Sequence, residues 1–459
     1  MMSFLKKFTP QNFRKGILII EKLLILLATS AAYLGMLELF YSAVCTDFSK
    51  ILILVLLYLV IFVLLFSAYG CWKIGILRLK ELIFSFLLSA FLADGISYFI
   101  VVLAAGEMLL IWPFVGLFAV QAVVGMVLYI IANKTYFSLR PAYNTVVICA
   151  NNRWEEEIIG KFRRIPERYH ISQVLYEDAS EKEMFFAIDA HSNVILGDIA
   201  AAKREKVLNY CFENNRRIYI LPTVQDIMLN SAAVTQIGDT MALLCRNRPM
   251  TMEQMAIKRL ADILISAIAL IVLSPVLAIV ALLIKLYDGG PVLFRQDRYT
   301  RNNEIFTLVK FRSMIVDAEK DGAQFTVPGD KRITPIGKFI RATRIDELPQ
   351  LINVLKGDMS IVGPRAERLE NADAYTEMMP EFRYRTKVKA GLTGYAQVYG
   401  KYNTSFEDKV RMDLYYIENY SLFMDFKLLL YTIKVIFMKG STEGFENETL
   451  KEEFRQDEK

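Results

Sequence analysis

Residues 260–286 read LADILISAIALIVLSPVLAIVALLIKL and decide how the C-terminal half of the chain meets a membrane. The run is apolar except for Asp262 and Lys285, and it is long enough to cross about 30 Å of hydrocarbon. Ser274 and Pro275 stand at its centre, where proline removes an intrahelical hydrogen bond and bends the helix. The Ser274 hydroxyl can satisfy backbone groups that the bend frees.

Basic residues flank this run on both sides, namely Lys258, Arg259, Lys285, Arg295, Arg298 and Arg301. A full crossing would carry the second cluster outside, against the positive-inside rule. We therefore expect a re-entrant helix over 260–286 that enters one leaflet, kinks at Ser274–Pro275 and returns. A straight span with a mild proline kink is the alternative.

Four further apolar runs precede it, at 23–44, 51–68, 82–105 and 108–132. Each reaches the roughly 20 residues that a transmembrane helix needs. The break at Gly106–Glu107 is short, so the third and fourth runs are expected to form a tight hairpin. Asp94 is an intramembrane charge, and it either has a function or helps the helices to pack.

Basic residues also set the orientation of these four spans. They precede the first run, separate the second from the third and follow the fourth: Lys6, Lys7, Arg14, Lys15, Lys73, Arg78, Lys80, Lys134 and Arg140. In the other two connections, the only basic residue is Lys50. The positive-inside rule therefore predicts that the N-terminus and everything after residue 133 are cytoplasmic.

The segment from 141 to 250 has the pattern of a soluble α/β domain. Stretches 144–150, 194–197 and 217–221 resemble buried parallel strands, which predicts a small Rossmann-like sheet. A dinucleotide site would need GxGxxG after the first strand, but residues 151–154 read NNRW. We interpret this segment as a degenerate regulatory or dimerising module, the latter implying a homodimer.

Composition excludes several kinds of chemistry. A formal net charge of +5 gives no reason to expect a nucleic-acid partner, and the five scattered cysteines contain no CxxC pair. Both histidines, His170 and His191, lie in the middle of the chain. Chemistry in the C-terminal half must therefore use carboxylates, Arg, Lys, Tyr or a metal.

The C-terminal half is rich in residues that bind phosphate. The candidates are Lys310, Arg312, Arg341, Arg344 and Arg365, grouped around Asp346 and Glu347 in the string DELPQL. A carboxylate can attack phosphorus when arginines and Mg²⁺ neutralise the phosphate charge, and an adjacent acidic pair can hold Mg²⁺ once phosphates complete its shell. The alternative is structural, with the acidic pair starting a helix and pairing with Arg341 or Arg344.

Residues from about 256 to 440 resemble the bacterial sugar transferases, or polyprenol-phosphate phosphoglycosyl transferases. The matching motifs occur in the family's order: Lys258–Arg259 with Asp262, Ser274–Pro275, Gly290–Pro291–Val292, KFRSM at 310–314, DELPQL at 346–351, Val362 to Arg365, and GLTGYAQ at 391–397. With the N-terminal spans and the middle domain, the resemblance is to the large, multi-span branch.

The resemblance implies a two-step reaction. Asp346 would attack the sugar-bearing phosphate of a UDP-sugar and release UMP, after which undecaprenyl phosphate would take the phosphosugar. It also implies Mg²⁺ near Glu347, phosphates held by Arg341 and Arg365, and a multi-pass protein of the bacterial inner membrane. Ala366, Ala390 and Lys401 depart from the family pattern; Lys401 replaces an arginine and cannot bind phosphate as a bidentate fork.

The expected organisation is therefore four transmembrane helices (1–140), a Rossmann-like cytoplasmic domain (141–250), a catalytic α/β domain with the re-entrant helix (251–440) and an acidic disordered tail (441–459). Residues 422–438 are amphipathic, as in an interfacial or a core helix. Two other functions remain open: a non-catalytic scaffold or regulator of polysaccharide synthesis, and an ordinary glycosyltransferase that would release UDP rather than UMP.

Overall fold

The computed structural model describes residues 10–42, 47–140, 142–162, 165–245, 250–316, 318, 330–400 and 404–436. The predicted tail at 441–459 and Lys401 lie outside these residues. The chain divides into two compact units, Met1–Leu221 and Pro222–Lys459. Residues 222–250, which the sequence grouped with the middle domain, thus belong to the same unit as the C-terminal half.

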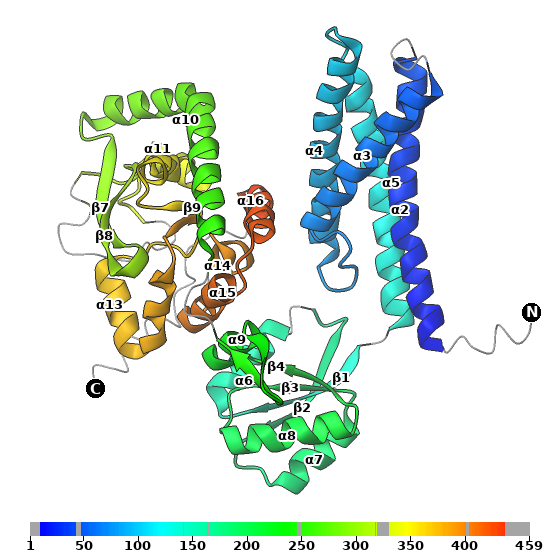
Figure 1. Ribbon diagram of the computed structural model, residues 1–459, viewed down its shortest axis with the longest axis vertical. Coiled ribbons are helices and arrows are strands. Elements are labelled where there is room, and N and C mark those ends of the chain that lie inside the picture. Colours follow the sequence, from blue (N-terminus) through cyan, green and yellow to red (C-terminus); the bar gives the residue numbers. More distant parts are fainter. Residues whose placement is uncertain are drawn as a thin grey trace, which may run out of the picture. The chain divides into compact units, whose positions relative to one another are not determined.

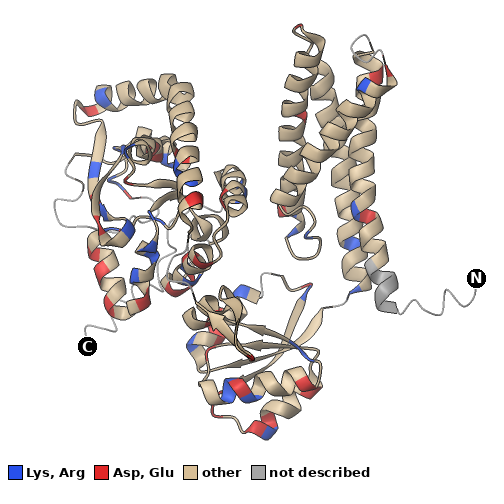
Figure 2. Cartoon of the chain, in the orientation of Figure 1, with Lys and Arg blue, Asp and Glu red and all other residues tan. Residues whose placement is uncertain are grey.

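The first unit begins with four long helices: α2 (Pro10–Phe40), α3 (Phe48–Ala68), α4 (Leu79–Ala105) and α5 (Trp112–Leu139) (Figure 1). All four are long and apolar enough to cross a membrane, and Figure 2 shows few charged residues along them. Each overlaps one of the four predicted apolar runs, although α2 begins at Pro10, well before the predicted start at residue 23. Gly106 ends α4 with φ +74°, which produces the predicted tight turn toward α5.

Aromatic rings and one acid fill the interior of this bundle. Tyr33 and Tyr58 stack with their ring centroids 4.1 Å apart. The Tyr58 hydroxyl donates to Asp94 Oδ1 at 3.3 Å and accepts from Gln121 Nε2 at 2.9 Å. Asp94 therefore joins α3, α4 and α5 in one buried polar network, as expected of a polar group enclosed by apolar helices.

A parallel sheet completes the first unit. Its strands are β1 (Tyr143–Cys149), β2 (Tyr169–Tyr176), β3 (Asn193–Leu196) and β4 (Arg217–Ile220), in the order β2-β1-β3-β4, with helices α6 (Asn152–Phe162), α7 (Glu181–Ala190) and α8 (Ala201–Glu213) between them. Three strands match the prediction, and β1 and β3 are buried as expected for central strands. The edge strand β2 was not predicted, because it is only half-buried and mixes polar with apolar residues.

The second unit begins with α9 (Val224–Asn230) and the hairpin β5 (Ala233–Ile237)–β6 (Thr240–Leu244). The long helix α10 (Met252–Asp288) follows. Next come β7 (Leu293–Tyr299), the short turn η1 (Arg301–Asn303), β8 (Ile305–Phe311), α11 (Pro335–Ala342), the 3-10 turn η2 (Ile345–Gln350), α12 (Leu351–Lys356), β9 (Ser360–Val362), α13 (Leu369–Met378), η3 (Pro380–Lys387), β10 (Gly391–Thr393), α14 (Tyr395–Tyr399), α15 (Phe406–Glu418) and α16 (Leu422–Ile436).

Helix α10 contains Pro275 and bends sharply in Figure 1. The Ser274 hydroxyl donates to the Ile271 carbonyl at 2.8 Å, which satisfies a backbone oxygen beside the proline. After the proline, Val280 and Ile284 are buried against Phe311 and Ile340 of the same unit. The second half of α10 therefore folds back over β8 and α11 and leaves its other face, including Leu282, exposed and apolar.

The base of α10 is fixed to segments near the end of the unit. Arg259 donates to the carbonyls of Val354 and Leu355 and thereby caps the C-terminal end of α12. Lys258 donates to the Val362 carbonyl at 3.0 Å and pairs with Asp425 of α16 at 2.5 Å.

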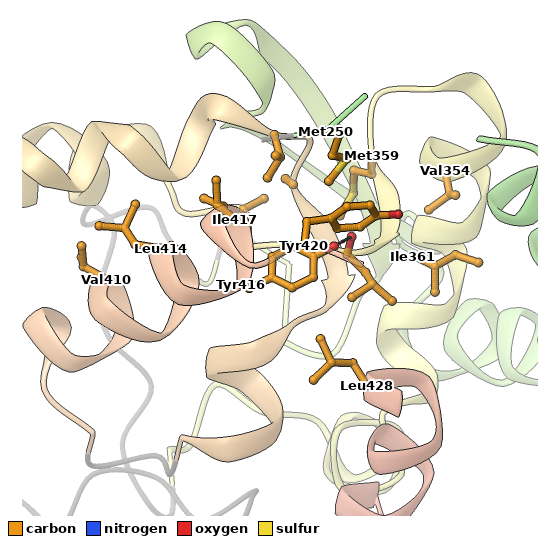
Figure 3. Close-up of a cluster of buried hydrophobic side chains, with 14 of the residues drawn as sticks. Met250, Val354, Met359, Ile361, Val410, Leu414, Tyr416, Ile417, Tyr420 and Leu428 are labelled. Atoms are coloured by element: carbon orange, nitrogen blue, oxygen red, sulfur yellow. Dashed lines mark hydrogen bonds between the residues drawn. The ribbon is translucent and has the colours of Figure 1, made fainter. Parts of the chain in front are cut away.

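The core of the unit lies next to these contacts (Figure 3). It includes Val354, Met359, Ile361, Leu414, Tyr416 and Leu428, from α12, β9 and its preceding turn, α15 and α16. Strands β9 and β10 pair in parallel beside this core. The chain after the DELPQL string is therefore held by both the core and the base of α10, whereas Ile340 and Ile345 before it pack against the second half of α10.

Candidate functional site

Asp346 and Glu347 lie in the first turn of η2, directly after α11. Thr334 caps α11 and Pro335 occupies its first turn, so the helix starts at a defined residue. Arg344 then adopts φ +58°, an uncommon conformation for a residue with a side chain. This left-handed residue redirects the chain from α11 into η2, and such conformations are concentrated at functional sites.

Asp346 is buried, with 8% of its surface exposed. Its Oδ1 has no hydrogen-bond partner among the described residues. Burial, and to a smaller extent the charge of Glu347, raise the pKa of Asp346 to about 6, although Lys310, Arg341 and Arg344 oppose the rise. The carboxylate is therefore ionised at neutral pH but poorly solvated, which makes it a better nucleophile and cation ligand than an exposed aspartate.

Glu347 differs from its neighbour because its charge is compensated. Its Oε1 lies 3.0 Å from Arg365 Nη2 and 3.5 Å from Arg344 Nη1. Burial alone would raise the pKa of Glu347, but the charges of Arg365 and Arg344 lower it overall. Two adjacent acids thus have pKa values shifted in opposite directions, a pattern typical of residues with different roles.

Lys310 stands near the acidic pair, and Arg298 lies near Lys310 and Arg365. Lys310 extends over the Phe294 ring at 5.1 Å from its centroid, and burial lowers its pKa to about 8 despite the charge of Asp346. Arg298 is also desolvated, which lowers its pKa to about 10, and it donates to the Ala366 carbonyl at 3.3 Å. No site role was predicted for Arg298. Side chains alternate between the two faces of a strand, so Phe294 and Arg298 share one face of β7. This alternation could have indicated a site role for Arg298.

The structure brings together most of the predicted site residues. Lys310, Arg341, Arg344 and Arg365 act electrostatically on Asp346 or Glu347. Arg312 is engaged elsewhere, because it forms an ion pair with Asp288 at the end of α10. The other terminal nitrogen of Arg312, Nη1, packs against Gly290. A Cβ on residue 290 would lie only 2.0 Å from this nitrogen. Ser274 and Pro275 lie in the bend of α10, and Lys401 is outside the described residues.

Among the described residues, no group of three or more His, Cys, Asp or Glu side chains could hold a metal ion. The Asp346–Glu347 pair still offers one buried acceptor without a partner, Asp346 Oδ1. Mg²⁺ prefers one or two carboxylates and completes its shell with water and substrate phosphates. The residues therefore fit a cation that arrives with a phosphorylated substrate.

The sequence also matches known proteins over this unit. The profile of the family described as "Bacterial sugar transferase" matches residues 253–439. The UDP-N-acetylgalactosamine-undecaprenyl-phosphate N-acetylgalactosaminephosphotransferase of Aeromonas hydrophila is 46% identical over 183 residues, 39% of this chain and 43% of that protein. The UDP-glucose:undecaprenyl-phosphate glucose-1-phosphate transferase of Klebsiella pneumoniae is 38% identical over 190 residues, 40% of this chain and 41% of that protein.

A shorter relative is covered almost completely. The exopolysaccharide production protein PSS of Rhizobium leguminosarum is 42% identical over 188 residues, 39% of this chain and 94% of that protein. The family profile covers the chain from α10 onward, and the matches span less than half of the two longer relatives. Asp346, Glu347, Lys310 and Arg365 all lie inside the matched range.

Proposed function

Because the chain belongs to the bacterial sugar transferase family, we propose that it transfers a hexose-1-phosphate from a UDP-sugar to undecaprenyl phosphate and releases UMP. This reaction would start the assembly of an exopolysaccharide, capsule or similar glycan. Undecaprenyl-phosphate sugar phosphotransferases are among the relatives named above, which supports this substrate class.

The single observation that carries the proposal is the state of Asp346. Its carboxylate is buried, has an oxygen without a partner, and is surrounded by Lys310, Arg341 and Arg344. A purely structural acid would have both oxygens satisfied, because an unpaired buried acceptor costs about 1–3 kcal/mol. Such a cost is expected where a carboxylate is kept ready for substrate.

In the first step, one Asp346 oxygen attacks the sugar-bearing phosphorus of the donor. The bond from that phosphorus to the bridging oxygen breaks, and UMP leaves with the electron pair of that bond. The product is a mixed anhydride between the Asp346 carboxyl and the phosphosugar. Arg365 and Arg344 already neutralise Glu347, so the carboxylate beside the nucleophile repels the incoming diphosphate less.

In the second step, an oxygen of the lipid phosphate attacks the same phosphorus. The bond to Asp346 breaks, the carboxylate is restored and a polyprenyl diphosphate sugar forms. Neither step requires a protein group to gain or lose a proton. The role of Lys310 is therefore electrostatic, since an ammonium near the reacting phosphate stabilises the charge that develops on its oxygens.

Mg²⁺ is the divalent ion that we propose for this site. Asp346 Oδ1 and Glu347 would hold it together with phosphate oxygens, and it would supply charge neutralisation for the diphosphate. The arginines would orient the donor phosphates, because a guanidinium can bind a phosphate through two parallel hydrogen bonds, which a hydrated metal ion cannot do.

We also propose that α10 is re-entrant and that both termini and the catalytic unit are cytoplasmic. The half of α10 after Pro275 has Val280 and Ile284 buried against the unit, and Leu282 and Leu286 exposed on its other face. A helix with one apolar face against protein and another exposed is suited to the membrane interface. Ile345, which precedes Asp346, packs against the cluster under this half, so the carboxylate would lie where a lipid phosphate headgroup resides.

The test is a panel of UDP-sugars given to the membrane-bound enzyme with undecaprenyl phosphate, scored by nucleotide release. UMP released with one donor, in proportion to lipid-linked product, is the expected result. Release of UDP would indicate an ordinary glycosyltransferase. No nucleotide release with any donor, from folded protein, would favour the scaffold or regulator.

A further inference from the structure

A cavity of about 230 Å³ opens beside the carboxylate pair, on the other side of Arg365. Its walls come from the end of β7, η1, the turn after β9, α13 and η3, and include Tyr299, Asn303, Arg365, Glu367, Asp373 and Thr376. Arg365 belongs to both places, because its guanidinium pairs with Glu347 while the residue lines the cavity. A molecule whose phosphate rests on Arg365 can therefore extend into this space.

The cavity lies away from the part of α10 that we place at the membrane. Strand β7 starts at Leu293, which packs with the cluster beneath α10, and ends at Tyr299 in the cavity wall. Its residues rise about 3.3 Å each, so the two ends are separated by about 20 Å. In Figure 1, α13 likewise lies at the opposite end of the β7–β8 hairpin from the second half of α10.

The lining carries charges of both signs, Glu367 and Asp373 beside Arg365, Arg383 and Arg385. Two of these arginines are already paired, Arg365 with Glu347 and Arg385 with the buried Asp413, so the lining suits a neutral, hydroxylated group next to a phosphate.

Glu367 and Asp373 offer carboxylate oxygens, which accept from sugar hydroxyls. Asp373 Oδ1 also accepts from the Tyr299 hydroxyl at 3.1 Å, which orients the carboxylate in the wall. Asn303 Oδ1 accepts from the Thr386 hydroxyl at 2.9 Å, which leaves the amide nitrogen able to donate to a carbonyl. Phe382 and Val388 add apolar surface for a flat ring. The volume is below the roughly 300–1,000 Å³ of sites that enclose a drug-sized ligand, so only part of a nucleotide sugar fits.

The donor has two neutral ends, the hexose and the nucleoside, and either could occupy the cavity. The route by which each of them leaves the enzyme decides between them. The hexose departs on the lipid, so it must be free to move toward α10 and the bilayer. The nucleoside departs in a soluble nucleotide and has no need to approach the membrane. Resting on the function proposed above, we infer that this cavity binds the nucleoside of the UDP-sugar, with Glu367 or Asp373 accepting from ribose hydroxyls and Asn303 donating to the base.

The test compares UMP binding with donor use in the full-length protein in lipid nanodiscs. Thr376→Leu fills the cavity from α13, and Asp373→Asn removes an acceptor without adding bulk. Ala374→Leu, at an exposed position of the same helix outside the lining, is the control for the added side-chain volume. The Kd for UMP is measured by calorimetry, and the KM for the donor by UMP release.

We expect Thr376→Leu to weaken UMP binding and raise the donor KM by the same factor, about tenfold or more, and Asp373→Asn to do so by about fivefold. Ala374→Leu should match the wild type in both. A raised donor KM with unchanged UMP affinity would overturn the inference by placing the hexose in the cavity, as would unchanged values in both lining variants. A wild type that released no UMP would instead refute the proposed function.

Discussion

Arg365 Nη2 donates to Glu347 Oε1 at 3.0 Å and thereby ties the turn after β9 to the first turn of η2. This ion pair gives the two adjacent acids different roles. Glu347 is neutralised by Arg365, while Asp346 retains an oxygen without a hydrogen-bond partner among the described residues. The same residue borders the cavity that we assign to the nucleoside. One side chain therefore connects the reacting carboxylates to the place where the donor is recognised.

The first prediction concerns pH. The Asp346 carboxylate must be ionised to attack, and its pKa is about 6 in the folded protein. The rate of the first half-reaction should therefore fall about tenfold per pH unit below about 6, instead of below about 4 as for an ordinary aspartate. UMP release from enzyme and donor without lipid acceptor is the measurement, because the phosphate monoester of the carrier itself titrates near pH 6.

A variant provides the control for this profile. Glu347 contributes to the raised pKa of Asp346, so the residual activity of Glu347→Gln should show its midpoint at lower pH than the wild type. A wild-type rate that stayed constant down to pH 5 would contradict the assigned pKa and its cause.

The second prediction concerns stability. Because the folded protein raises the pKa of Asp346 from 3.8 to about 6, folding favours the protonated form, and the ionised form costs stability at every pH above about 6. Asp346→Asn should raise the free energy of unfolding at pH 7.5 by about 3 kcal/mol at most, since each pKa unit corresponds to about 1.4 kcal/mol. Thermal unfolding in nanodiscs measures it.

At low pH the stability advantage of Asp346→Asn over the wild type disappears but does not change sign. Between pH 6 and 4 the wild-type side chain becomes neutral, so the advantage of Asp346→Asn should shrink and vanish below about pH 4. Asp297→Asn, an exposed position on β7, is the matched control and should change little at either pH. A destabilised Asp346→Asn protein at pH 7.5 would mean that the carboxylate makes a structural contact.

The third prediction concerns topology. If α10 is re-entrant, a reporter fused after residue 301 should be cytoplasmic, as should one fused after residue 140 at the end of the fourth helix. A periplasmic reporter after residue 301, with a cytoplasmic one after 140, would show that α10 crosses the bilayer and would remove the re-entrant arrangement.

The fourth prediction concerns the metal. Chelation with EDTA should abolish UMP release, and added Mg²⁺ should restore it, because Arg344 and Arg365 already share their charge with Glu347. UMP binding in the cavity should be weakened less than donor turnover, since the proposed nucleoside contacts involve no metal. Full turnover in EDTA would exclude the proposed ion.

Features set by local pattern were predictable from the sequence. The apolar runs became α2 to α5, and the buried stretches at 144–150, 194–197 and 217–221 became β1, β3 and β4, because apolar periodicity and length act over short distances. The motif string also identified most of the cluster around Asp346. Edge strand β2 was missed because its exposed positions carry polar residues that weaken the signal.

Features that depend on long-range packing were not predictable. Arg298 became desolvated beside Lys310 only because β7 pairs with β8 and the Ala366 carbonyl approaches it. Arg312 fits the pattern of a phosphate ligand, yet Asp288 at the end of α10 engages it. Residues 222–250 belong with the second unit, and there Ser231 reaches Glu418 of α15, a partner far along the chain.

Mass spectrometry tests most directly whether Asp346 carries the phosphosugar between the two steps. Enzyme incubated with UDP-sugar but no lipid acceptor should be quenched, digested and compared with Asp346→Asn treated in the same way. We expect a hexose-phosphate adduct on the peptide that contains Asp346, absent from the variant and removed by undecaprenyl phosphate. An adduct on another residue, or UMP release without any adduct, would contradict it.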